Sequence, residues 1–136
     1  MGNFSPIQHP VIKVFGDTEM AAIAVSTGTA TSEWFDVSAW ADKKVAWEVD
    51  SGGAIDVDID IHTSSQGAYE LNNKTATTDD YVAINVVTAH TDALYTVKDS
   101  SDIDDFQRTH RSWRVVVGND SAAAITGGAV WIEGSA

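Results

Sequence analysis

The stretch Ala54 to His62, AIDVDIDIH, places three aspartates and then a histidine at alternate positions, with isoleucine and valine between them. Such a row could bind a metal ion, form an acid/base pair, or line the hydrated face of a strand. Residues two apart on a strand lie about 6.6–7 Å apart on one face, whereas Ca²⁺ takes six to eight oxygens at about 2.3–2.6 Å. Adjacent aspartates therefore suit a shared ion poorly. We interpret the row as the hydrated face of a strand, with cation binding or a basic partner surface as alternatives.

A second acidic cluster, DSSDIDDFQRTHR at 99–111, resembles a calcium loop only superficially. An EF-hand loop needs Gly at its sixth position and Glu at its twelfth, and counted from Asp99 these are Asp104 and His110. The four histidines, at 9, 62, 90 and 110, show no metal-binding spacing, and the sequence has neither a nucleophile elbow nor a phosphate-binding loop. We therefore expect no catalytic residue, no metal ligand and no cofactor, and we predict that the protein is not an enzyme.

The five tryptophans are further candidates for ligand binding, because exposed indole rings can stack on sugar rings. Trp47 and Trp113 alternate in phase with valines, which predicts core positions. Trp131 is out of phase with its apolar neighbours, and Trp34 and Trp40 flank a predicted strand. These last three are the candidate sugar-stacking residues, although such residues more often fill a sandwich edge or a subunit interface.

Basic residues are also unevenly distributed. Arg108, Arg111 and Arg114 are three of only eight lysines and arginines, and they lie within seven positions. Pairing with the nearby aspartates 102, 104 and 105 is the simpler interpretation. The alternative is a basic patch that meets an acidic surface of an identical subunit in a head-to-tail ring.

Short strands must position all of these side chains. Alternating β-branched and aromatic residues, separated by Gly, Asn, Asp or Ser clusters, predict strands at 33–40, 43–50, 54–62, 80–89, 93–99, 111–119 and 128–134. The turn DSGG at 50–53 predicts a hairpin between the second and third of them. Only 18–26 could form a short helix. We predict an all-β fold: an antiparallel two-sheet β-sandwich of jelly-roll type with an extended N-terminal arm.

The first 20 residues differ from the rest of the chain. Pro6 and Pro10 prevent a continuous ladder, while apolar residues between and beyond them offer anchors. We predict an arm over 1–20 and a single sandwich domain over 21–136, and the arm could cross its own sandwich or lie on a neighbour. The predicted partner-binding residues are Phe4, Ile7, Val11, Ile12 and Phe15 of the arm, together with Arg108 and Arg111.

Composition excludes several kinds of partner. The 136 residues are 43% apolar, enough for one folded domain, and they carry a formal charge of −12. That charge disfavours nucleic acid and anionic membranes. Cysteine is absent, and we see neither a secretory signal nor an apolar run of membrane-spanning length. We therefore expect a soluble protein that folds in the cytoplasm of the cell that makes it.

Two stretches, 29–65 and 111–134, resemble small virion proteins of tailed phages. In the first, a Ser/Thr-rich lead reaches FDVS, a lysine-bearing turn opens a long strand, and a glycine-rich turn leads to a second alternating strand. The second resembles a closing hairpin, in which an arginine- and valine-rich strand is followed by a loop of small residues and a last strand. Related patterns occur in capsid decoration (cement) proteins, head fibres and tail accessory domains. The resemblance brings no catalytic or ligand residue with it.

The resemblance implies a structural virion protein, most simply a decoration protein on the capsid surface. Its partner would be the major capsid protein or another virion protein, and it would form a homo-oligomer, a trimer or a dimer. The alternative is a carbohydrate-binding module or tail adhesin that uses exposed tryptophans. From the predicted arm, we expect that deleting residues 1–15 leaves a soluble, β-rich protein that no longer binds.

Overall fold

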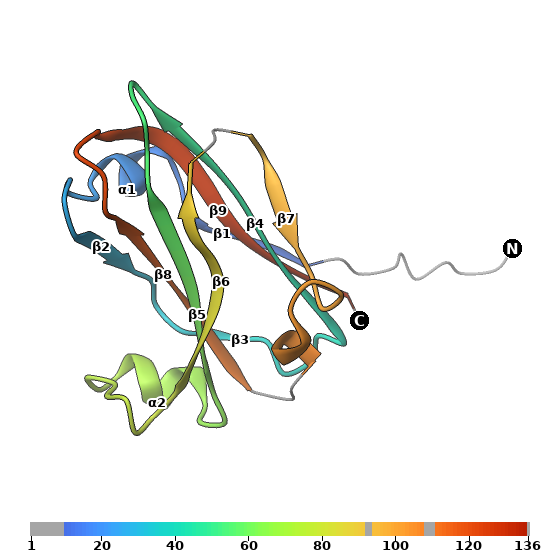
Figure 1. Cartoon of the computed structure of the whole chain (residues 1–136). Coiled ribbons are helices and arrows are strands. Elements are labelled where there is room, and N and C mark those ends of the chain that lie inside the picture. The colour runs from blue at the N-terminus through green and yellow to red at the C-terminus, as the bar shows by residue number, and fades with distance from the viewer. Residues whose placement is uncertain (1–9, 92–93, 108–110, 136) are drawn as a thin grey trace, which may run out of the picture.

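The computed structural model describes residues 10–91, 94–107 and 111–135, which form two antiparallel sheets stacked on one another (Figure 1). The four-stranded sheet contains, in spatial order, β1 (Val11–Phe15), β9 (Ile125–Ser135), β4 (Asp42–Ser51) and β7 (Thr96–Lys98). The five-stranded sheet contains β2 (Gly28–Thr31), β8 (Ser112–Asn119), β5 (Val57–Ser64) and β6 (Val82–His90), with β3 (Phe35–Asp36) also paired to β8. The predicted all-β sandwich is confirmed.

The order of the strands is that of a jelly roll. β2 and β3 pair with successive parts of β8, so together they act as one interrupted strand. The β5–β6 connection stays within one sheet, and every other connection between these elements crosses from one sheet to the other. This winding of an antiparallel double sheet defines the jelly-roll architecture, as the alternating strand pattern predicted.

Alternation places one side of each strand in a common core. Valine, isoleucine and tryptophan from β4, β5, β8 and β9 meet between the sheets, and most of their side chains are fully buried. The largest fully buried members of this core are Trp47, Trp113, Phe106 and Met20. Such burial stabilises the fold by about 1.5–3 kcal/mol for each large apolar side chain.

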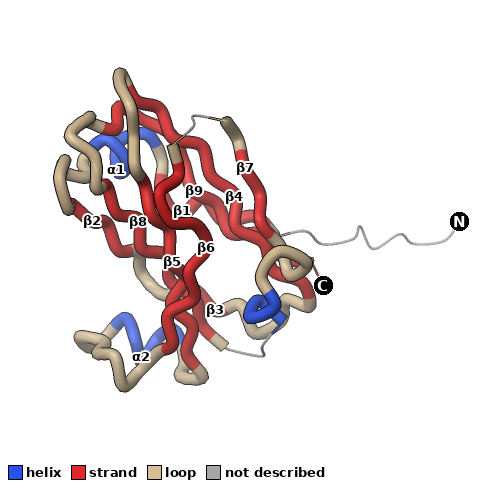
Figure 2. The backbone as a smooth tube through the Cα atoms, viewed as in Figure 1, coloured by secondary structure: helices blue, strands red, loops and turns tan. Residues whose placement is uncertain are grey.

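Short helices cover the ends of the sandwich rather than its faces. Figure 2 shows α1 (Asp17–Ala21) and α2 (Ala68–Asn72) towards opposite ends of the sheets. A third short helix, η1 (Asp104–Gln107), is of the 3₁₀ type. Met20 of α1 is completely buried in the core, so α1 closes one end of the sandwich within the stretch 18–26 where a short helix was considered.

The predicted hairpin between 43–50 and 54–62 is wrong. β4 and β5 belong to different sheets, and β4 pairs with β7 and β9 while β5 pairs with β6 and β8. The glycine-rich turn therefore carries the chain across the core. The resemblance to a closing hairpin over 111–134 fails for the same reason, because β8 and β9 also lie in different sheets.

Part of the predicted arm is a strand of the sandwich. β1 pairs antiparallel with β9, and Phe15 at its end is buried in the core with 6% of its surface exposed. Ile12 packs partly against the same core, whereas Val11 is 56% exposed. An arm boundary at residue 20 therefore does not match the structure. Phe4 and Ile7 lie outside the described residues.

Candidate functional site

The aspartates of β5 lie on the outer face of the five-stranded sheet, as the alternation predicted. Their alternates Val57, Ile59 and Ile61 are fully buried, whereas Asp58 and Asp60 are only partly covered. Two contacts from the neighbouring strand β6 stabilise the charges. The Ala89 amide donates to Asp58 Oδ1 at 2.8 Å, and the Asn85 side-chain amide donates to Asp60 Oδ1 at 2.9 Å.

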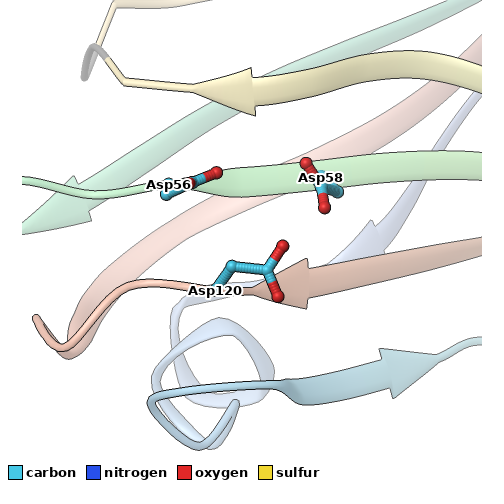
Figure 3. A group of neighbouring side chains, drawn as sticks. All are labelled: Asp56, Asp58 and Asp120. Atoms are coloured by element: carbon cyan, nitrogen blue, oxygen red, sulfur yellow. The ribbon is translucent and has the colours of Figure 1, made fainter.

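The outer face also brings in a carboxylate that the sequence pattern did not single out. Asp120 follows β8, and its amide donates to the Asp56 carbonyl at 2.9 Å. Ligand oxygens of Asp56, Asp58 and Asp120 lie within 4.8 Å of one another, and Figure 3 shows the carboxylates of Asp58 and Asp120 turned towards each other. A hydrogen bond with Asp58, and then its negative charge, raise the pKa of Asp120 above the ordinary value.

This cluster could do one of two things. Three convergent carboxylates supply the oxygen ligands that Ca²⁺ prefers, but exposed acidic groups also gather without an ion. Neighbouring aspartates along one strand are too far apart to share a cation well, as the spacing indicated. Asp120, which follows the adjacent strand β8, adds a third carboxylate close to those of Asp56 and Asp58. In the absence of a cation, the hydrogen bond between the Asp58 and Asp120 carboxyl groups requires a shared proton, and protons are scarce at neutral pH.

Repulsion within the cluster gives a testable expectation. We expect Asp120→Asn to raise the melting temperature at pH 7, because it removes one charge while an amide can still donate to Asp58. The raised pKa means that the folded state takes up this proton more readily than the unfolded chain, so the repulsive cost declines as pH falls towards 3.8. The gain should therefore shrink in acid. Thermal unfolding with and without CaCl₂ checks this: if Asp120→Asn is less stable and loses a calcium-dependent rise in melting temperature, a bound cation holds the cluster.

A second constellation lies further along the same face. The His62 and Tyr81 rings stack in parallel with centroids 4.0 Å apart, and Arg114 Nε donates to His62 Nδ1 at 3.0 Å. The Arg114 guanidinium also lies 4.8 Å from the centre of the Trp34 ring and 5.0 Å from that of Tyr81. Arg114 is thus held by aromatic rings and an imidazole rather than standing with Arg111 as an exposed basic patch.

The arginine–aromatic cluster keeps His62 neutral. Partial burial, followed by the charge of Arg114, lowers its pKa from 6.5 to about 4, against a smaller opposing effect of Asp60. The bond from Arg114 needs the lone pair on His62 Nδ1, which a proton would occupy. Because the charge of Arg114 is stabilised by the rings and His62 is uncharged, this arrangement is suited to stabilising the fold rather than to general acid/base catalysis near neutrality.

The outer face of the four-stranded sheet has a different character. Cross-strand pairing aligns Val97, Ala46, Trp131 and Lys13 in one row over β7, β4, β9 and β1. Tyr95 precedes β7 and contacts Trp131 edge to face, with ring centroids 5.7 Å apart, and 55% of its surface is exposed. This face therefore combines aromatic and aliphatic side chains that reach solvent.

A hollow lies at the end of that face. It has a volume of about 310 Å³ and is lined by Asp42, Lys44, Glu133, Gly134 and Ser135. Lys44 and Glu133 are direct cross-strand partners. We call this cavity the sheet-end hollow.

The structure places the five tryptophans in different environments. Trp47 and Trp113 are core residues with 0% and 1% exposure, as predicted. Trp34 is 4% exposed and lies beside Arg114, so it offers no free ring to a sugar. Trp40 packs against Gly134, where a side chain would collide with the indole. Of the three candidates, Trp131 is the one on an open sheet face beside another aromatic ring.

The predicted partner-binding residues are not gathered into one site. Val11 is exposed at the edge of the four-stranded sheet, but Phe15 is turned into the core. Arg111 is exposed at the start of the strand that carries Arg114. Arg108, like Phe4 and Ile7, lies outside the described residues.

Comparison with known proteins identifies no family. No family model matches the chain, and no curated protein matches it. Among solved structures, the chain is similar to one described as "Structure of infectious bursal disease virus Gx strain", with a TM-score of 0.46 and 10% sequence identity. The match covers 98% of this chain and 37% of that one, so the chain spans little more than a third of its length. A likeness at this level carries no inference about function. None of the described helices is long and apolar enough to cross a membrane.

Proposed function

We propose that the protein is a structural virion component, a capsid decoration protein that binds the shell without performing chemistry. The observation that carries this proposal is the contrast between the two outer faces of the sandwich. The outer face of the four-stranded sheet presents Tyr95, Val97 and Trp131 among charged side chains, whereas that of the five-stranded sheet presents a row of carboxylates. A two-faced domain of this kind suits attachment to a surface on one side and contact with water on the other.

The apolar face supplies the adhesive surface. Tyr95 and Val97 are 55% and 40% exposed, and Val11 is 56% exposed at the free edge of the same sheet. Contiguous exposed apolar residues are typical of interaction sites on soluble proteins. β1, which forms this edge, begins directly after Pro10.

The carboxylate face suits the solvent side. Asp56, Asp58, Asp60 and Asp120 contribute to a formal charge of −12, which keeps neighbouring copies soluble and separated. Many copies on a symmetric shell need only weak individual contacts when an oligomer engages several sites together. Jelly rolls serve in both viral capsids and lectins, so the fold is compatible with the proposal and does not select it.

Co-sedimentation with empty capsids assembled from the co-encoded major capsid protein tests the proposal. We expect saturable binding of the full chain and a higher melting temperature of the decorated shell. A chain that begins at Pro10 should bind about ten-fold more weakly or worse, because it lacks the apolar residues Phe4 and Ile7. Circular dichroism of both chains must first show the same β-sheet content. Absence of binding at micromolar concentrations, combined with retention on a glycan array, would favour the adhesin alternative.

A further inference from the structure

We infer that the sheet-end hollow receives an arginine side chain of the capsid subunit, with Glu133 as its carboxylate and the Trp131 ring, two positions before Glu133 on β9, as the aromatic surface beside the hollow. The inference rests on the proposed function and names the contact that anchors it. The hollow adjoins the apolar face at the end where Glu133 pairs with Val11. A volume of about 310 Å³ is at the lower end of the range for ligand pockets, which suits one side chain rather than a large molecule.

The charged residues of the hollow are arranged with space between them. Lys44 and Glu133 are direct cross-strand partners, yet no ion pair joins them within the described part of the chain. Hydrogen bonds from Ser101 chiefly lower the pKa of Asp99, and Lys44 lies near enough to contribute to that shift. Partial burial chiefly raises the pKa of Tyr95, and Glu133 lies near enough to add to it. Glu133 lies on the same strand as Trp131, whereas Lys44 lies on the neighbouring strand β4.

The aromatic side fits a guanidinium group. Arginine stacks on aromatic rings and donates in parallel to both oxygens of a carboxylate, which lysine cannot match. Trp131 and Glu133 are two positions apart on β9 and therefore lie on the same face of the sheet, and Tyr95 contacts Trp131. The protein already uses this chemistry on its other face, where Arg114 lies over Trp34 and Tyr81.

Charge complementarity selects a basic occupant over a neutral sugar. Asp42 and Glu133 outnumber Lys44 among the lining residues, and the whole chain carries a formal charge of −12. A negative protein attracts cationic surfaces over long range, which accelerates docking and fixes its orientation. Glycan hydroxyls could bond to the same carboxylates, but they would gain nothing from this field.

The first described residue connects the hollow to the edge of the sheet. The amide of Gly134, which lines the hollow, donates to the Pro10 carbonyl at 2.9 Å. The hollow therefore adjoins the start of β1, at the edge where Val11 is exposed.

Two substitutions test the anchor in the full chain. Glu133→Gln removes the carboxylate charge, and Tyr95→Leu removes an exposed ring while keeping an apolar side chain. We expect each to weaken binding to empty capsids about ten-fold, and Glu133→Gln to reduce the salt dependence of binding. Glu33→Gln is the matched control, because Glu33 is exposed beside the other sheet, and it should bind within about two-fold of the unmodified protein.

A small probe tests the chemistry of the hollow without capsids. L-arginine amide should shift the NMR signal of the Trp131 indole, L-lysine amide should shift it less, and Glu133→Gln should abolish the arginine effect. Normal capsid binding by both variants would overturn the inference and leave the proposed function standing. Failure of the unmodified protein to bind capsids would instead count against the proposed function. A Trp131 shift with chitin or cellulose oligosaccharides but none with arginine amide would replace the arginine with a sugar.

Discussion

Replacing Phe15 with alanine is expected to lower the free energy of unfolding by about 3–5 kcal/mol, whereas Val11→Ala should change it by less than about 0.5 kcal/mol. Both residues belong to β1, five positions that were predicted to be part of an arm. Phe15 is 6% exposed and belongs to the core between the sheets, while Val11 is 56% exposed at the edge. The large difference follows because only the first substitution opens a cavity.

Urea unfolding of the two variants checks this expectation. Equal and small effects would mean that β1 is held loosely and that the arm extends to residue 20 after all. The expected result has a practical consequence for binding experiments. Deleting residues 1–15 removes Phe15 and all four β1–β9 residue pairs, so loss of binding would reflect a damaged sandwich. A deletion that ends before Pro10 leaves that strand intact.

Much of the architecture follows from alternation in the sequence. A buried–exposed period of two predicted which residues of β5 face the core, and it separated Trp47 and Trp113 from Trp131. These predictions succeed because a strand has only two faces and an apolar face must be covered. The same alternation also predicted a jelly-roll sandwich, since many short strands need two sheets to bury one face each.

Pairing between strands could not be predicted in the same way. Val45, Trp47 and Val49 face the same core as Val57 and Ile59, but from the opposite sheet. Alternating segments around a glycine-rich turn look alike whether the turn closes a hairpin or crosses the core. β1 was missed because Pro6 and Pro10 argue against a strand in this part of the sequence, yet β1 begins directly after Pro10.

The clusters on the outer faces depend on contacts between distant residues. Asp120 joins Asp56 and Asp58 because β8 and β5 are neighbours, and its position directly after an alternating segment was the only available signal. His62 and Arg114 are 52 residues apart and meet because they are cross-strand partners. Once the β5–β8 register is known, both clusters follow from it.

Acidification from pH 7 to 4.5 is expected to weaken the fold by about 1–2 kcal/mol through His62 alone, because solvent screens part of the effect at this partly exposed side chain. The folded pKa of about 4 lies below the ordinary value of 6.5, so the folded state resists a proton that the unfolded chain accepts. Stability from this group is therefore complete above pH 6.5 and is lost as pH falls towards 4. Urea unfolding at several pH values measures the loss, and NMR should show the His62 imidazole still neutral at pH 5.

The acid effect has a specific physical origin in the arginine–aromatic cluster. A proton on His62 Nδ1 would remove the acceptor for Arg114 Nε, which lies 3.0 Å away, and would place two cations in contact. Arg114 cannot relieve this cheaply, because its guanidinium lies over Trp34 and Tyr81. Protonation must therefore disrupt the ring stack, the arginine contacts, or both, and the connection between β5 and β8 would weaken with them.

His62→Asn separates this effect from the titration of carboxylates. The asparagine Oδ1 can take the place of Nδ1 as acceptor for Arg114, but the side chain does not titrate, and the stack on Tyr81 is lost. We expect the variant to be less stable than the unmodified protein at pH 7 and to lose about 1–2 kcal/mol less on acidification. A parallel decline in both proteins would assign acid sensitivity to the aspartates instead. If His62 titrates near 6.5 in the folded protein, Arg114 is not bonded to it in solution, and the cluster cannot be what joins these two strands.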